Sequence, residues 1–91
     1  MMEAKPISLI NPSDNDLLRF AMISELDAIT TYEQIIQNTT NNDLKIVMKD
    51  IITEEKGHFG ELQTLLLSLD PEQETQNVKG NNEVKLLTNT D

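Results

Sequence analysis

The chain of 91 residues contains no cysteine, and its basic residues are few. Without cysteine it can form no disulfide framework, no zinc knuckle and no thiol-based catalytic centre. Seven lysines and arginines stand against sixteen aspartates and glutamates, which gives a net charge of −9. Eleven of the acidic residues but only four of the basic ones fall within residues 14–70, so this segment carries −7. Such a surface repels nucleic acid and anionic membranes and attracts cations.

Long apolar runs are also lacking, and none of those present could span a bilayer. Residues 1–9 lack the basic start and the long apolar core of a signal peptide. We therefore expect a cytoplasmic protein that binds neither membranes nor nucleic acid. A length of 91 residues allows one domain at most.

Helix breakers divide the chain into three parts. Residues 1–13 hold two of the three prolines and are predicted to be an irregular lead-in. A first helix is predicted from residue 14 to about residue 37 and a second from residue 43 to about residue 69, joined by an Asn- and Thr-rich turn. Asp70 precedes Pro71 and so ends the second helix. Residues 71–91 are polar and are predicted to be a disordered tail, whose few apolar residues either dock on a partner or have no role.

Two helices cannot enclose a core by themselves. The first helix is apolar on more than one side, which implies several buried faces. Chains of this size usually need a metal, disulfides or self-association to be stable, and disulfides are excluded here. The sequence therefore predicts an all-α fold in which an antiparallel two-helix hairpin, residues 14–70, dimerises into a four-helix bundle.

In both predicted helices, residues that could bind a metal ion interrupt a stripe of apolar residues. Glu25 interrupts the first stripe, and Glu55 and His58 interrupt the second. The apolar members of the two stripes are Leu18, Ala21, Ala28, Tyr32 and Ile35, and then Leu44, Val47 or Met48, Ile51, Leu62, Leu65 and Leu69. An unpaired carboxylate among leucines costs several kcal/mol unless a cation compensates it. Glu55 and His58 are three residues apart, so one metal ion can reach both.

The three residues are also expected to lie level. Glu25 is 15 residues before residue 40 and Glu55 is 15 residues after it, so each lies about 22 Å from the loop at 1.5 Å per residue. A dimer would gather two copies of Glu25 and two of the Glu55–His58 pair, the ligand set of carboxylate di-iron proteins. This set suits iron and manganese above all, with zinc or calcium as substitutes.

Each candidate also has an interpretation without a metal. Glu-x-x-His is common on protein surfaces, and Glu25 alone could flank the edge of a core. Tyr32 is either a plain core aromatic or a group that hydrogen-bonds a metal ligand or donates an electron. Asp27 could belong to a weaker, outer cation site. Glu54 and Glu61 flank the stripe and are expected to form a solvated face.

Residues 25–32 (ELDAITTY), followed after a short turn by residues 54–58 (EEKGH), resemble the encapsulated ferritins. These are two-helix ferritin-like proteins packaged inside encapsulin nanocompartments, and the resemblance covers about residues 14–70. It implies a ferritin-like bundle with an iron-oxidising di-iron site shared between two chains, Glu25, Glu55 and His58 being ligands and Tyr32 lying close by. It also implies a decamer made as a ring of five dimers, with iron storage in a surrounding encapsulin shell in the cytoplasm.

The chain departs from the pattern of that family at several places. Thr31 stands where family members often have tryptophan, and Ser24 where they often have a carboxylate. The second change would leave Asp27 to serve the outer metal site alone. Residues 84–88 (VKLLT) are only a loose match to the cargo-loading peptide of the family.

Three functions follow in order of preference. The first is a ferroxidase that oxidises Fe(II) at the shared site. The second is a rubrerythrin-like di-iron peroxide reductase, although such enzymes usually add a rubredoxin-type cysteine site and this chain has no cysteine. The third is a metal-free helical hairpin that acts as an interaction module, in which Glu25, Glu55 and His58 would be buried without compensation.

Overall fold

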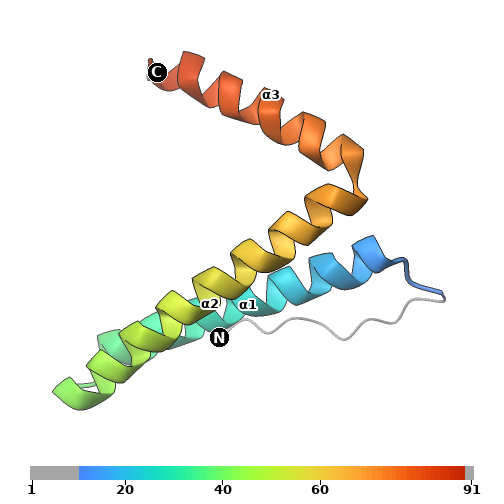
Figure 1. Cartoon of the computed structure of the whole chain (residues 1–91). Coiled ribbons are helices and arrows are strands. Elements are labelled where there is room, and N and C mark those ends of the chain that lie inside the picture. Colours follow the sequence, from blue (N-terminus) through green and yellow to red (C-terminus); the bar gives the residue numbers. More distant parts are fainter. Residues whose placement is uncertain (1–10, 90–91) are drawn as a thin grey trace.

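A computed structural model describes residues 11–89 of the chain. Residues 1–10, which make up most of the predicted lead-in, and residues 90–91 lie outside the described residues. The described part consists of the helices α1 (Asp14–Asn38), α2 (Asn42–Leu69) and α3 (Pro71–Thr88), with no β-strand. α1 and α2 run side by side in opposite directions, and α3 turns away from α2 (Figure 1). The predicted all-α fold is confirmed.

Local capping sets the ends of the hairpin helices. The Ser13 hydroxyl accepts a hydrogen bond from the Asp16 backbone N–H at 3.1 Å, and the Asp16 carboxylate accepts one from the Ser13 N–H at 3.0 Å. These bonds, the backbone one foremost, hold the pKa of Asp16 below its ordinary value. Asn41 starts α2 by accepting a hydrogen bond from the Leu44 N–H at 3.0 Å. Both helices therefore begin within one residue of the predicted positions.

The tail is where the sequence prediction was wrong. Residues 71–88 form an ordered helix, not the predicted disordered segment. Asp70 caps this helix by accepting a hydrogen bond from the Gln73 N–H at 3.2 Å, and Pro71 occupies the first helical position, where no N–H is needed. Glu72 and Glu74 lie in the first turn, where negative charge stabilises a helix. The same Asp-Pro pair that ends α2 thus begins α3.

An ion pair between Arg19 and Asp70 ties the bend between α2 and α3 to α1. Arg19 Nη2 lies 3.0 Å from Asp70 Oδ2, while the other carboxylate oxygen of Asp70 caps α3. The Asp70 backbone N–H in turn donates to the Leu66 carbonyl at 2.8 Å, which closes α2. Asp70 therefore ends one helix, starts the next and connects the bend to the start of the hairpin.

The hairpin encloses almost no core by itself. Among residues 11–89 only Ile52 and Leu66 are buried hydrophobic residues. Twelve large apolar side chains are exposed, from all three helices. Exposed apolar surface on this scale is typical of a surface that associates with another chain. None of the described helices is both long and apolar enough to cross a membrane.

Candidate metal centre

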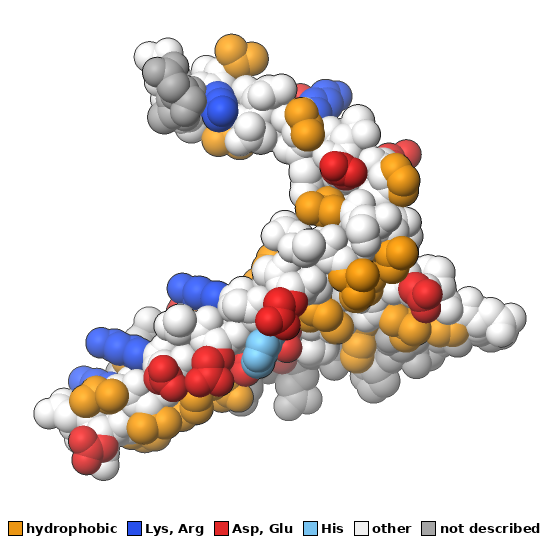
Figure 2. Space-filling model, viewed as in Figure 1, with side chains coloured by type: hydrophobic (Ala, Val, Ile, Leu, Met, Phe, Trp, Pro, Cys, Tyr) orange, Lys and Arg blue, Asp and Glu red, His pale blue; other side chains and the backbone are white. Residues whose placement is uncertain are grey.

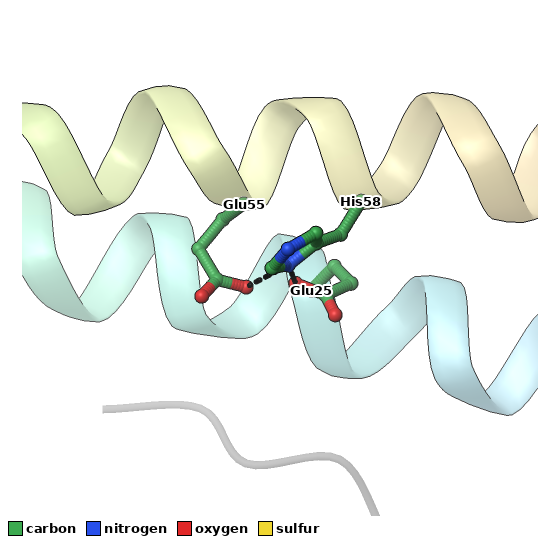
Figure 3. Close-up of side chains that lie close together, drawn as sticks. All are labelled: Glu25, Glu55 and His58. Atoms are coloured by element: carbon green, nitrogen blue, oxygen red, sulfur yellow. Dashed lines mark ion pairs between the residues drawn. The ribbon is translucent and has the colours of Figure 1, made fainter.

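Glu25, Glu55 and His58 meet on the seam between α1 and α2. Glu25 comes from the middle of α1, and Glu55 and His58 come from successive turns of α2. Their side chains converge, with the imidazole between the two carboxylates (Figure 3). The equal distances of Glu25 and Glu55 from the loop in sequence thus do place them at the same level of the antiparallel pair.

The spacing of the three side chains is wider than hydrogen bonding requires. His58 Nδ1 lies 3.6 Å from Glu25 Oε2 and 3.7 Å from Glu55 Oε2, whereas N–H···O hydrogen bonds are about 2.7–3.2 Å long. One candidate ligand atom from each residue lies within 4.8 Å of the others. Two metal–ligand bonds of about 2.1 Å span at most about 4.2 Å. Small side-chain rotations would therefore bring all three residues to one ion.

Glu25 provides the strongest local reason to expect a cation. Its Oε2 atom is shielded from solvent and has no hydrogen-bond partner. A buried acceptor left unsatisfied costs about 1–3 kcal/mol, and a charged one more. The residues present therefore fit a divalent cation, which would satisfy this oxygen and balance the two carboxylates.

The cluster opens to one side. The carboxylate side chains of Glu25 and Glu55 are about one fifth exposed, at 22% and 19%, but the His58 side chain is 49% exposed. Three ligands from one chain also leave coordination positions free, because divalent iron and manganese take more than three ligands. The half-exposed side of His58 is therefore where further ligands could come from.

The other predicted site residues lie outside this cluster. Asp27 is half-buried, and its Oδ1 atom is shielded without a hydrogen-bond partner, as in Glu25. The Thr31 hydroxyl beside it donates to the Asp27 backbone carbonyl at 2.9 Å rather than to the carboxylate. Tyr32 is half-buried two turns after Glu25 on α1. Glu54 is exposed, as the sequence predicted for a solvated face, and Glu61 is exposed too.

A family model described as Rubrerythrin matches residues 16–90 of the chain. The chain belongs to the rubrerythrin family. Among solved structures it is similar to the encapsulated ferritin domain from Pyrococcus furiosus, with a TM-score of 0.82 and 40% identity, over 93% of this chain and 91% of that one. The resemblance to encapsulated ferritins is therefore confirmed, and with it the ferritin-like character of the helical fold.

The names of two curated relatives refer to encapsulin. This rubrerythrin-family chain is 47% identical over 73 residues to a ferritin-like-encapsulin shell fusion protein from Pyrococcus furiosus. It is 32% identical over 71 residues to the encapsulin nanocompartment cargo protein EncC from Myxococcus xanthus. The matches cover 80% and 78% of this chain but only 21% and 55% of those relatives. The functions of the whole relatives therefore extend beyond the part that matches.

Proposed function

We propose that the chain is a ferroxidase whose di-iron site is completed by a second copy. The observation that carries the proposal is the convergence of Glu25, Glu55 and His58 within 4.8 Å, together with the shielded Glu25 Oε2, which has no hydrogen-bond partner. Two copies related by a two-fold axis would gather four carboxylates and two imidazoles, the ligand set of carboxylate di-iron proteins. The four negative charges would balance two Fe(II) ions.

The exposed side of the cluster supports a second copy as the source of the remaining ligands. His58 is half-exposed there, while the hairpin buries only Ile52 and Leu66. Closing two hairpins over the cluster would bury apolar surface and exclude water from the carboxylates at the same time. The resulting dimer would be the unit of larger rings, such as the ring of five dimers that the resemblance to encapsulated ferritins implies.

Bound Fe(II) would supply the redox chemistry: two Fe(II) would each lose one electron to become Fe(III), and one dioxygen would take up the two electrons with two protons to become hydrogen peroxide. The carboxylates of Glu25 and Glu55 would bind the more highly charged Fe(III) more strongly than Fe(II), which favours oxidation. His58 would contribute the nitrogen ligand and keep the cluster from becoming an all-carboxylate cage. Tyr32, two turns after Glu25, would hydrogen-bond a metal ligand or donate an electron. Asp27, whose Oδ1 atom has no hydrogen-bond partner, would hold a cation at an outer site.

Fe(II) oxidation tests this function directly. Protein is loaded with Fe(II) without oxygen, air is admitted, and the growth of Fe(III) absorbance is followed. Glu55→Ala removes two ligands from the paired site and should abolish rapid oxidation. Glu54→Ala is the matched control, because Glu54 is the neighbouring carboxylate on α2 but is exposed. A Glu55→Ala protein that oxidises iron at the wild-type rate would refute the assignment.

A di-iron peroxide reductase is the second candidate, and membership of the rubrerythrin family favours it. The chain contains no cysteine for a rubredoxin-type electron supply, which favours the ferroxidase. Hydrogen peroxide offered in place of dioxygen, with a reductant present, separates the two: sustained peroxide consumption identifies the reductase. A metal-free interaction module accounts less well for the chain, because it leaves the shielded Glu25 oxygen without a hydrogen bond.

We also propose that the chain is the cargo of an encapsulin shell in the cytoplasm. The proposal rests on the two relatives, one named as a fusion to an encapsulin shell and the other as an encapsulin cargo protein. Residues 84–88 remain the candidate targeting segment, and Leu86 is 83% exposed. Co-expression with an encapsulin shell should yield shells that contain the chain, and Leu86→Asp should reduce the amount packaged. Equal packaging of the two proteins would exclude this leucine as a contact.

A further inference from the structure

The direction in which α3 leaves the hairpin is held by few contacts. A single residue, Asp70, lies between α2 and α3. In residues 11–89 the backbone of α3 packs on α2 alone, and none of residues 71–88 is buried. α3 therefore stands away from the hairpin (Figure 1), without the packed apolar face that fixes the direction of most helices.

The backbone at Asp70 can turn without breaking a helical hydrogen bond. The Asp70 N–H donates to the Leu66 carbonyl at 2.8 Å as part of α2, whereas the Asp70 carbonyl accepts from the Glu74 N–H at 3.2 Å as part of α3. The N–Cα bond of Asp70, whose rotation is φ, lies between these two hydrogen bonds, so rotation about it leaves both intact. Pro71 confines Asp70 to extended conformations but still allows its φ about 40° on either side of −120°. The observed φ is −128°.

Rotation about φ of Asp70 also preserves the cap of α3. The Asp70 side chain branches from Cα and moves together with α3 in this rotation, so its Oδ1 atom keeps the hydrogen bond from the Gln73 N–H. The interaction to α1 must break, because Arg19 stays with the hairpin while Asp70 Oδ2 moves. The Arg19–Asp70 ion pair is therefore the polar contact that opposes the turning of α3.

Arg19 is itself fixed on both sides. Its Nη1 atom lies 3.4 Å from Asp16 Oδ1, while its Nη2 atom lies 3.0 Å from Asp70 Oδ2. The other oxygen of Asp16 accepts hydrogen bonds from the Ser13 N–H and hydroxyl, at 3.0 and 2.9 Å. The Asp70 side chain is only 17% exposed, so water screens its ion pair less than it screens a pair on the open surface.

We propose that Asp70 is a hinge and that the chain of contacts from Asp16 through Arg19 to Asp70 is a latch, which holds α3 in its observed direction. With the latch closed, α3 is tied to the start of α1. With the latch open, α3 turns about Asp70 as a folded and capped helix. Because the latch consists of charges near the protein surface, dissolved ions weaken it, and the ionic strength sets how freely α3 turns.

The latch controls an apolar groove at the bend. The groove has a volume of about 340 Å³. Ile23 and Leu26 of α1 and Phe59 of α2 form one wall, and Gln73 and Asn77 of α3 form the other. Figure 2 shows hydrophobic side chains gathered around this bend. Turning α3 moves one wall relative to the other, and so changes how much of Ile23 and Leu26, both about half exposed, is open to solvent.

Distances between two spin labels measure the direction of α3. The chain contains no cysteine, so Gln34→Cys on α1 and Asn82→Cys on α3, both exposed, place labels at these positions alone. Labelled chains are mixed with an excess of unlabelled chains, so that pulsed electron paramagnetic resonance reports the distance within one chain. Arg19→Gln opens the latch and should broaden the distance distribution and shift its mean. Lys49→Gln, which removes the same charge from an exposed position of α2 far from the bend, is the matched control and should leave the distribution unchanged.

Asp70→Asn separates the latch from the cap. Asparagine caps helices about as well as aspartate but carries no charge. This variant should therefore broaden the distribution as Arg19→Gln does, while its helical circular dichroism stays at the wild-type value. Salt should act in the same direction: at about 1 M, where the Debye length is about 3 Å, the wild type should approach the Arg19→Gln distribution, and Arg19→Gln should hardly respond.

An unchanged distribution in both Arg19→Gln and Asp70→Asn would overturn the proposal, because other contacts would then hold α3. Equal broadening in Lys49→Gln would overturn it as well, since the loss of any positive charge would then suffice. The hinge and the latch share no residue with the metal centre, and these distances are measured without iron. Failure of the ferroxidase proposal, seen as unchanged Fe(II) oxidation in Glu55→Ala, would therefore leave this result as it is.

Discussion

Replacing Glu25 with methionine should raise the stability of the metal-free protein and abolish its stabilisation by metal. Glu25 Oε2 is shielded without a hydrogen-bond partner, and its side chain is 22% exposed. An unsatisfied buried polar group costs about 1–3 kcal/mol, and the partial exposure of this side chain argues for the lower end, about 1 kcal/mol. For a chain of this size that is a rise in Tm of about 4–8 °C.

Metal should reverse which of the two proteins, the wild type or Glu25→Met, has the higher Tm. A divalent ion present at 100 times its Kd stabilises the wild-type protein by about 2.7 kcal/mol, which is a rise in Tm of roughly 10–20 °C. Glu25→Met lacks a ligand in each half of the site, so its Tm should hardly respond. The variant is therefore expected to melt above the wild type without metal and below it with metal.

The measurement is thermal unfolding at pH 8 with chelator or with Zn(II), which does not change its oxidation state. Chain concentration is held constant, because association makes Tm depend on it. Glu54→Met is the control, since an exposed substitution on α2 should change stability by at most about 0.5 kcal/mol and keep the full response to zinc. A Glu25→Met protein that melts below the wild type in chelator, yet gains as much from zinc, would refute the reasoning.

Three further outcomes follow from single contacts. Asp16 is ionised above its lowered folded-state pKa and then stabilises α1. The stability that Asp16→Asn loses at neutral pH should therefore shrink as the pH falls below about 3.9, the ordinary pKa of an aspartate, and disappear once the pH is below the folded-state pKa. Urea unfolding at several pH values measures this loss. Asp70→Ala removes the cap of α3 and the partner of Arg19. It should lower the helical circular dichroism signal and reduce the free energy of unfolding by about 1–2 kcal/mol, a larger loss of stability than Arg19→Ala causes. Tyr32→Phe should slow Fe(II) oxidation far less than Glu55→Ala, because only a hydroxyl is lost; an equal loss in both would make Tyr32 essential.

Local sequence signals were sufficient for the hairpin and for the three side chains that converge on its seam. Ser13 and Asn41 cap their helices through hydrogen bonds to residues three positions away, and such contacts can be inferred from neighbours in the chain. Glu25 and Glu55 could be brought level because antiparallel helices of constant rise convert equal residue counts into equal heights.

For residues 71–88, amino-acid composition led to the wrong prediction of disorder. Low hydrophobicity predicted disorder for residues 71–91, yet Asp70 and Pro71 are as good a start for a helix as they are an end for the preceding one. That information was present in the sequence, but the polar composition outweighed it in the prediction.

The sequence by itself determined the two hairpin helices and the three residues of the candidate metal centre, because each depends on spacing along one helix or on a count from one turn. Only the tertiary structure decided the direction of α3, the pairing of Arg19 with Asp70 across 51 residues, and the groove between α3 and the hairpin. It also revealed that the Glu25 Oε2 atom is shielded from solvent without a hydrogen-bond partner. These features depend on the angle at which separate helices meet, which side-chain packing sets and no local pattern encodes.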